Sequence, residues 1–146
     1  MTDNLVVIDA SVVVKAILPN PLQNHCLLLV QTFDKKQPVA PALWAYETTS
    51  AIAKSVHFGA VTEEEAYQAL EKLDGLGVRQ FVPDAEQNLA AFNWTLRLKR
   101  ASAYDSYYLV LAQMLECDFW TADQRLFNAL QENHPGWVHW IEEMTP

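Results

Sequence analysis

Short apolar runs alternate with stretches of helical periodicity along the chain. Leu5–Ile8 is a continuous apolar run, which is typical of a strand buried on both faces of a parallel sheet. A helix is predicted at residues 11–18 because Pro19 ends the periodic stretch, and Asn20 followed by Pro21 is typical of the start of the next helix. The same patterns predict further strands at 38–40, 78–82, 118–121 and 137–141, and further helices at 22–33, 43–56, 62–73, 84–99, 102 or 104 to 116, and 123–130.

This alternation favours one fold class. Strands separated by helices form a parallel sheet covered by helices on both faces. We therefore expect a three-layer α/β/α fold with a central, mainly parallel sheet, in a single domain that spans residues 1–146. In such sheets ligands bind outside the carboxyl ends of the strands.

Composition and charge narrow the choice of function class. Apolar residues make up 51% of the chain, which is enough for a hydrophobic core and excludes a disordered protein. The net charge of −8 argues against tight binding of nucleic acid by the whole surface, although a local basic track stays open. Cys26 and Cys117 are far apart in sequence, and Met1 is followed directly by a strand pattern without a leader. We therefore expect a reduced cytoplasmic protein with no membrane-spanning segment.

Four acids stand next to apolar elements. Asp9 follows the first strand, Glu47 lies inside a helical stretch, Asp105 opens an apolar helix, and Asp123 follows the strand at 118–121. A carboxylate beside a core element is costly unless it is paired, hydrogen-bonded or bound to a metal. Carboxylate oxygens suit hard cations such as Mg²⁺ or Mn²⁺. The four acids thus point to one divalent-metal site and to metal-assisted phosphodiester chemistry.

Each acid also has an ordinary structural explanation. Asp9, Asp105 and Asp123 stand where a helix N-cap or a first-turn charge is expected. Glu47 shares a helix face with Ser50 and Lys54. The alternative explanation is that this face is simply exposed to solvent. Ser11 offers a hydroxyl group two residues after Asp9 that could hold a ligand or a phosphate oxygen.

The chain from about residue 5 to residue 140 resembles the PIN domain family of metal-dependent ribonucleases, and within it the VapC-type toxins of type II toxin–antitoxin pairs. The resemblance rests on four segments in this order: Val7-Ile8-Asp9-Ala10-Ser11, Pro41-Ala42-Leu43-Trp44-Ala45-Tyr46-Glu47, Tyr104-Asp105-Ser106-Tyr107-Tyr108-Leu109-Val110-Leu111-Ala112 and Trp120-Thr121-Ala122-Asp123-Gln124-Arg125-Leu126. One position departs from the family pattern, because Ser50 stands where asparagine is usual.

The resemblance implies an endoribonuclease that hydrolyses RNA. Asp9, Glu47, Asp105 and Asp123 would be its catalytic acids and would bind Mg²⁺ or Mn²⁺, with the Ser11 and Thr121 hydroxyls beside them. It also implies a homodimer and a small antitoxin protein that blocks the site. Without an antitoxin, a nuclease of RNA processing is the alternative. Basic residues near the acids are candidates for RNA contact, namely Lys15, Arg97, Lys99, Arg100 and Arg125.

Three other function classes compete with this interpretation. Phosphatases with an aspartate nucleophile require a second aspartate two residues after the first, and Ser11 occupies that position. A receiver domain would need an acidic pair before the first helix and a late lysine, and neither pattern is present. An inactive PIN scaffold that binds RNA or a protein stays open as an alternative, although the complete set of four acids favours an enzyme.

Overall fold

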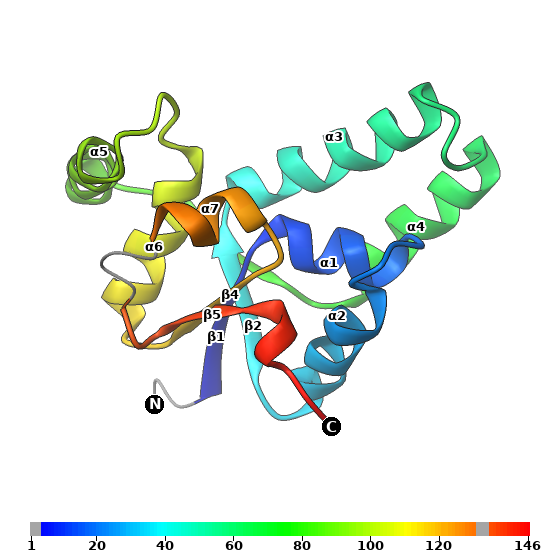
Figure 1. Ribbon diagram of the computed structural model, residues 1–146, viewed down its shortest axis with the longest axis horizontal. Helices are drawn as coiled ribbons and strands as arrows, with labels where there is room; N and C mark the ends of the chain where they lie inside the picture. The colour runs from blue at the N-terminus through cyan, green and yellow to red at the C-terminus, as the bar shows by residue number, and fades with distance from the viewer. Residues whose placement is uncertain (1–3, 131–134) are drawn as a thin grey trace.

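The computed structural model describes residues 4–130 and 135–146, which form a five-stranded sheet with helices on both sides (Figure 1). Every strand pairing is parallel, and the strand order is β3-β2-β1-β4-β5. The strands are β1 (Leu5–Ile8), β2 (Gln37–Pro41), β3 (Arg79–Phe81), β4 (Asp118–Thr121) and β5 (Val138–Trp140). The predicted three-layer α/β/α fold is therefore confirmed.

The helices lie in two outer layers and one projecting hairpin. They are α1 (Ala10–Ile17), α2 (Gln23–Val30), α3 (Leu43–His57), α4 (Glu63–Gly75), α5 (Ala85–Leu98), α6 (Tyr104–Leu115) and α7 (Gln124–Ala129), with 3-10 turns η2 (Gln31–Asp34) and η4 (Ile141–Glu143). Helices α5 and α6 lie on one side of the sheet and α1 and α2 on the other, while α3 and α4 form a hairpin that extends beyond it (Figure 1). Helix α6 packs directly on β1, β2 and β4.

Capping boxes mark the start of two helices, α4 and α5. The Thr62 hydroxyl accepts a hydrogen bond from the backbone N–H of Glu65, and the Glu65 carboxylate accepts one from the N–H of Thr62, as the predicted capping box requires. Asp84 and Gln87 form the same pair at the start of α5. The helix predicted at 22–33 is shorter in the structure. The α-helix α2 ends at Val30, and the chain continues as the 3-10 turn η2.

The core lies between the sheet and its two helical layers. Val7 and Ile8 of β1 and Phe119 of β4 are 0% exposed, which matches the expectation of strands buried on both faces. The ring of Tyr108 from α6 packs on Phe119 with 5.8 Å between ring centroids. Cys26 and Cys117 are buried and unbridged, as predicted. Within the described residues, none of the helices has the length and apolar character that crossing a membrane requires.

The strand order makes the boundary between β1 and β4 a topological switch point. From β1 the chain builds outward through β2 and β3, then returns to the other side of β1 to form β4 and β5. Ile8 is in register with Trp120, so the two strands end at the same edge, with Asp9 just after β1 and Asp123 just after β4. Such a switch point is where open parallel sheets bind ligands.

The packing of α6 on the sheet gives a test of this fold. Leu109 on α6 is 0% exposed, so Leu109→Ala should reduce the free energy of unfolding by about 2–5 kcal/mol through the cavity it leaves. Leu89 on α5 is 62% exposed, and Leu89→Ala should change the free energy of unfolding by no more than about 0.5 kcal/mol. Urea denaturation of both variants measures the difference. Equal losses would contradict the placement of α6.

Candidate metal centre

Asp9 is buried at the junction of β1 and α1. It is only 4% exposed, and although it precedes α1 its side chain makes no cap hydrogen bond. Its Oδ2 instead accepts hydrogen bonds from the hydroxyls of Ser11 and Thr121, each at 2.7 Å. The structure therefore contradicts the N-cap explanation for Asp9. It gives the two predicted hydroxyls the role of holding this carboxylate.

Burial makes the charge of Asp9 costly. Burial raises the pKa of Asp9 to about 7, the hydroxyl hydrogen bonds of Ser11 and Thr121 lower it, and the charges of Asp105 and Glu47 raise it. A buried carboxyl group with a strongly raised pKa at a switch point of a parallel sheet is a candidate for a functional site. The two hydroxyls offset only part of the cost, so the site favours a bound proton or a bound cation.

Backbone groups of the loop after β4 fix the two hydroxyls. Ser11 Oγ accepts from the N–H of Ala122 at 3.0 Å, and Thr121 Oγ1 accepts from the N–H of Asp123 at 3.0 Å. Lys15 donates from Nζ to the carbonyl oxygen of Ala122 at 2.7 Å. The start of α1 and the loop after β4 are thus tied together around the Asp9 carboxylate.

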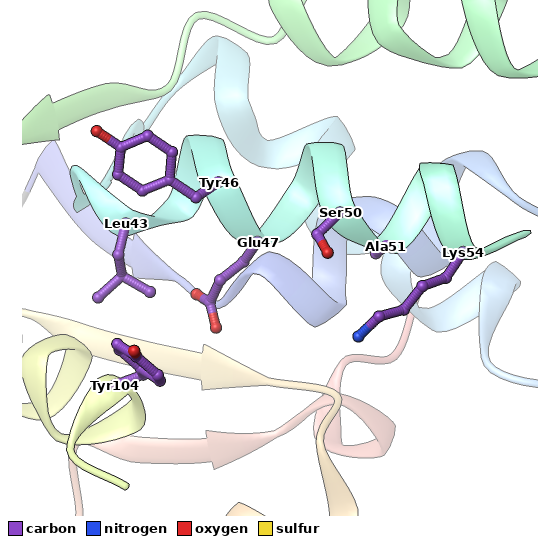
Figure 2. A pocket seen from close by; sticks show the side chains of 7 residues that line it. All are labelled: Leu43, Tyr46, Glu47, Ser50, Ala51, Lys54 and Tyr104. Carbon is purple, nitrogen blue, oxygen red and sulfur yellow. The ribbon is translucent and has the colours of Figure 1, made fainter.

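Glu47 on α3 lies close enough to Asp9 for its charge to raise the pKa of that carboxyl group. The hydroxyl of Tyr108 on α6 donates to Glu47 Oε1 at 2.7 Å. Burial raises the pKa of Glu47, the Tyr108 hydrogen bond lowers it, and the charges of Asp105 and Asp123 raise it. Glu47, Ser50 and Lys54 line one cavity of about 440 Å³ (Figure 2). Ser50 and Lys54 are exposed, as the solvated-face alternative expects, whereas Glu47 is partly buried.

Tyr108 was missed by the sequence analysis. It stands three residues after Asp105, so both face the same side of α6, and this spacing is the signal that could have found it. Burial, together with the charges of Asp9 and Glu47, raises the pKa of Tyr108 well above its ordinary value. The phenol therefore stays protonated and serves as a hydrogen-bond donor to Glu47.

Asp105 and Asp123 approach from helix N-termini. Asp105, in the first turn of α6, makes an ion pair at 2.9 Å with Arg100. Burial raises the pKa of Asp105, the Arg100 charge lowers it, and the Asp123 charge raises it. Asp123 Oδ1 accepts from the backbone N–H groups of Arg125 and Leu126, so the predicted N-cap role of Asp123 is confirmed.

The four acids form one electrostatic neighbourhood, as their mutual effects on pKa indicate. Over residues 4–130 and 135–146, however, no three Asp, Glu, His or Cys side chains are arranged as a ready set of metal ligands. The Asp105 carboxylate is paired with Arg100, and the Asp123 carboxylate accepts a hydrogen bond from the backbone at the start of α7. The donor atoms of the four acids are all oxygen, and this chemistry fits Mg²⁺ or Mn²⁺.

The predicted RNA-contact residues fall into two groups. Arg100 pairs with Asp105 and also donates from Nη1 to the backbone carbonyl of Arg125 at 3.4 Å, so its guanidinium group lies between Asp105 and the start of α7. Arg97 lies 4.0 Å over the ring of Trp94, and Arg97 and Lys99 line a different cavity. Of the five predicted residues, Arg100 is the one whose side chain contacts an acid of the set, whereas Lys15 is engaged with a backbone carbonyl.

Comparisons with known proteins inform the fold. No family model matches the sequence, and no curated protein matches it. Among solved structures, the chain is similar to the crystal structure of PAE2754 from Pyrobaculum aerophilum, with a TM-score of 0.68 and 18% sequence identity over 98% of this chain and 87% of that chain. At this identity the likeness shows a shared fold across nearly the whole chain.

The raised pKa of Asp9 predicts how stability depends on pH. Because the folded state binds this proton more tightly than the unfolded state, the free energy of unfolding should fall as pH rises from about 4 through about 7. Asp9→Asn keeps the acceptor for Ser11 and Thr121 and removes the charge. In chelator at pH 8 the variant should be more stable than wild type, by up to about 4 kcal/mol.

Denaturation with urea at pH 5 and pH 8 measures this difference. Asp74→Asn, at an exposed acid on α4, is the matched control and should follow the wild-type profile. Parallel pH profiles for wild type and Asp9→Asn would show that the Asp9 charge is not costly in the folded protein.

Proposed function

We propose that this protein is a metal-dependent endoribonuclease of the PIN domain type. The observation that carries the proposal is the buried Asp9 carboxylate, held by two hydroxyls at the switch point and facing the charges of Glu47 and Asp105. Purely structural acids seldom occupy such a position, because burying several carboxylates together destabilises the fold. A divalent cation offsets this cost, and an oxygen-only donor set suits Mg²⁺ or Mn²⁺.

The acids would hold the cation, and the remaining groups would orient the reactants. When bound, Mg²⁺ or Mn²⁺ would neutralise the phosphodiester charge and lower the pKa of a water molecule. Asp9, Asp105 and Asp123 would ligate the cation directly or through water. Glu47, oriented by Tyr108, would ligate it or position the attacking water.

Arg100 fits a role in phosphate binding. Its guanidinium group already lies against Asp105, at the edge of the acid cluster. If Asp105 turns toward a cation, the guanidinium is released from its ion pair. Arginine binds phosphate oxygens through paired hydrogen bonds, so the freed group would hold the RNA backbone beside the site.

The wider biological setting rests on the family resemblance alone. It places the protein in the cytoplasm as a homodimeric toxin with a small antitoxin protein that blocks the site. The four motif segments support this assignment by their order and spacing.

A second candidate function is a PIN scaffold that binds RNA or a protein without cleaving RNA. The Arg100–Asp105 ion pair favours this alternative, because a guanidinium group takes one of the four carboxylates away from a cation. The metal requirement of the purified protein separates the two functions.

RNA cleavage tests the proposed activity. The purified protein should cleave single-stranded RNA in Mg²⁺ or Mn²⁺ and lose this activity in chelator. Asp9→Asn should lower the rate at least a hundredfold, whereas Asp74→Asn should not change it. Activity should fall as pH drops below about 7, because protonation of Asp9 competes with the cation, and the midpoint should move to higher pH at lower Mg²⁺ concentration.

Two results would refute the nuclease. Equal cleavage by Asp9→Asn would mean that Asp9 is not in the site, and activity unchanged down to pH 5 would exclude the buried carboxylates as ligands. RNA binding without cleavage in any divalent cation would favour the scaffold.

Tyr108→Phe tests how the Glu47 carboxylate is held. The variant keeps the ring that packs on Phe119 and removes the hydroxyl that donates to Glu47. Loss of this outer hydrogen bond should weaken Mn²⁺ binding by about 10- to 100-fold, as measured by calorimetry. Tyr107→Phe removes a hydroxyl bonded to Asn88 instead and is the matched control. Unchanged Mn²⁺ affinity in Tyr108→Phe would remove Glu47 from the metal site.

A further inference from the structure

A groove lies beside Glu47, between α3 and the start of α6. It has a volume of about 440 Å³ and is lined by Leu43, Tyr46, Glu47, Ser50, Ala51, Lys54 and Tyr104. Figure 2 shows the Glu47 carboxylate pointing into it, with Tyr104 on one side and Lys54 on the other. The groove therefore opens directly onto one of the four acids.

Two tyrosines on the groove are unusually exposed. Tyr46 is 76% exposed and Tyr104 is 66% exposed, and neither phenol hydroxyl bonds to another residue in the described part of the chain. Large exposed aromatic groups gathered at one hollow mark a binding surface. A flat aromatic face next to a phosphodiester site suits a nucleobase, because every base has a face that stacks on an aromatic ring.

Helix α3 sets the order of groups along the groove. Leu43, Glu47, Ser50 and Lys54 are spaced by three or four residues, so they form one row along the helix. Lys54 stands two turns beyond Glu47, roughly 10 Å along the axis. Lys54 makes no ion pair with a described residue, so its ammonium group is free to meet a phosphate.

We propose that this groove binds unpaired nucleobases of a single-stranded RNA, one stacked on Tyr104 and a neighbouring base on Tyr46, with a phosphate at Lys54. The inference rests on the proposed function, since it names the form of RNA that the same site takes. A base inside a duplex is already stacked on both faces and must first leave its stack to reach the tyrosines. The groove therefore selects single strands and loops over duplex RNA.

Fluorescence anisotropy with a short labelled oligoadenylate tests the subsite. The Asp9→Asn background keeps the RNA intact during the measurement. Tyr104→Leu and Tyr46→Leu in this background should each weaken binding by about 5- to 100-fold. Tyr67→Leu, at a tyrosine on α4 that is 68% exposed, should bind as the background does. A matched oligoadenylate–oligouridylate duplex should bind more weakly and show no dependence on Tyr104 or Tyr46.

The salt dependence of the same binding tests Lys54. Lys54→Gln should reduce the slope of log affinity against log salt concentration by about 0.7, which corresponds to one phosphate of a single strand. Lys35→Gln, at an exposed lysine in the turn before β2, is the control and should leave the slope unchanged.

The outcomes separate this inference from the proposed function. Tyrosine-dependent binding by a wild-type protein that cleaves no RNA would keep the subsite and refute the nuclease. Cleavage and binding unaffected by both tyrosine variants would keep the nuclease and overturn the subsite, as would absence of oligoadenylate binding. If Tyr46→Leu or Tyr104→Leu instead changed the oligomeric state in sedimentation without changing RNA affinity, the groove would belong to a second copy of the chain.

Discussion

The organising constraint of this structure is the charge of one buried carboxylate. Asp9 sits where the central strand ends, almost without contact to solvent, and receives hydrogen bonds from Ser11 and Thr121. These hydroxyls are in turn held by the loop after β4. Side chains from both sides of the switch point and backbone groups of one loop thus hold a single acid, although burial still raises the pKa of Asp9 to about 7. Such an arrangement positions the carboxylate of a site but lowers the free energy of unfolding.

The other acids increase the cost of charge on Asp9. Glu47 and Asp105 raise the pKa of Asp9 by their charge, and Asp123 raises the pKa of both. Two protein donors relieve the repulsion in part, namely the Tyr108 hydroxyl at Glu47 and the Arg100 guanidinium group at Asp105. A divalent cation would relieve it for all four acids at once, and this is the physical basis of the proposed metal centre.

Much of this fold could be predicted from the sequence because its element boundaries carry local signals. The apolar run of β1, the proline after α1 and the capping box at Thr62 each act within a few residues, and the structure confirms all three. The alternation of strands and helices was enough to predict a parallel sheet. The strand order was not predicted, since pairing depends on which hydrophobic faces meet in three dimensions.

Prediction of the site was less complete, for a related reason. Asp9 and Asp123 occupy equivalent places after a strand, yet only Asp123 caps its helix. The difference arises because Thr121 approaches Asp9 from a neighbouring strand, which no local pattern encodes. The pairing of Arg100 with Asp105, over five residues, could have been suspected from their spacing, whereas the contact of Tyr108 with Glu47 joins two helices far apart in sequence.

The most direct test of the central claim is a crystal structure of the protein soaked in Mn²⁺, with the ion located by its anomalous scattering. The account predicts one anomalous peak bounded by Asp9, Glu47 and Asp105, with the Asp105 carboxylate turned away from Arg100. Two results would contradict the assignment of these acids to a metal centre. One is the absence of a peak at the four acids at saturating Mn²⁺, with the Arg100–Asp105 ion pair intact, and the other is a peak elsewhere on the molecule.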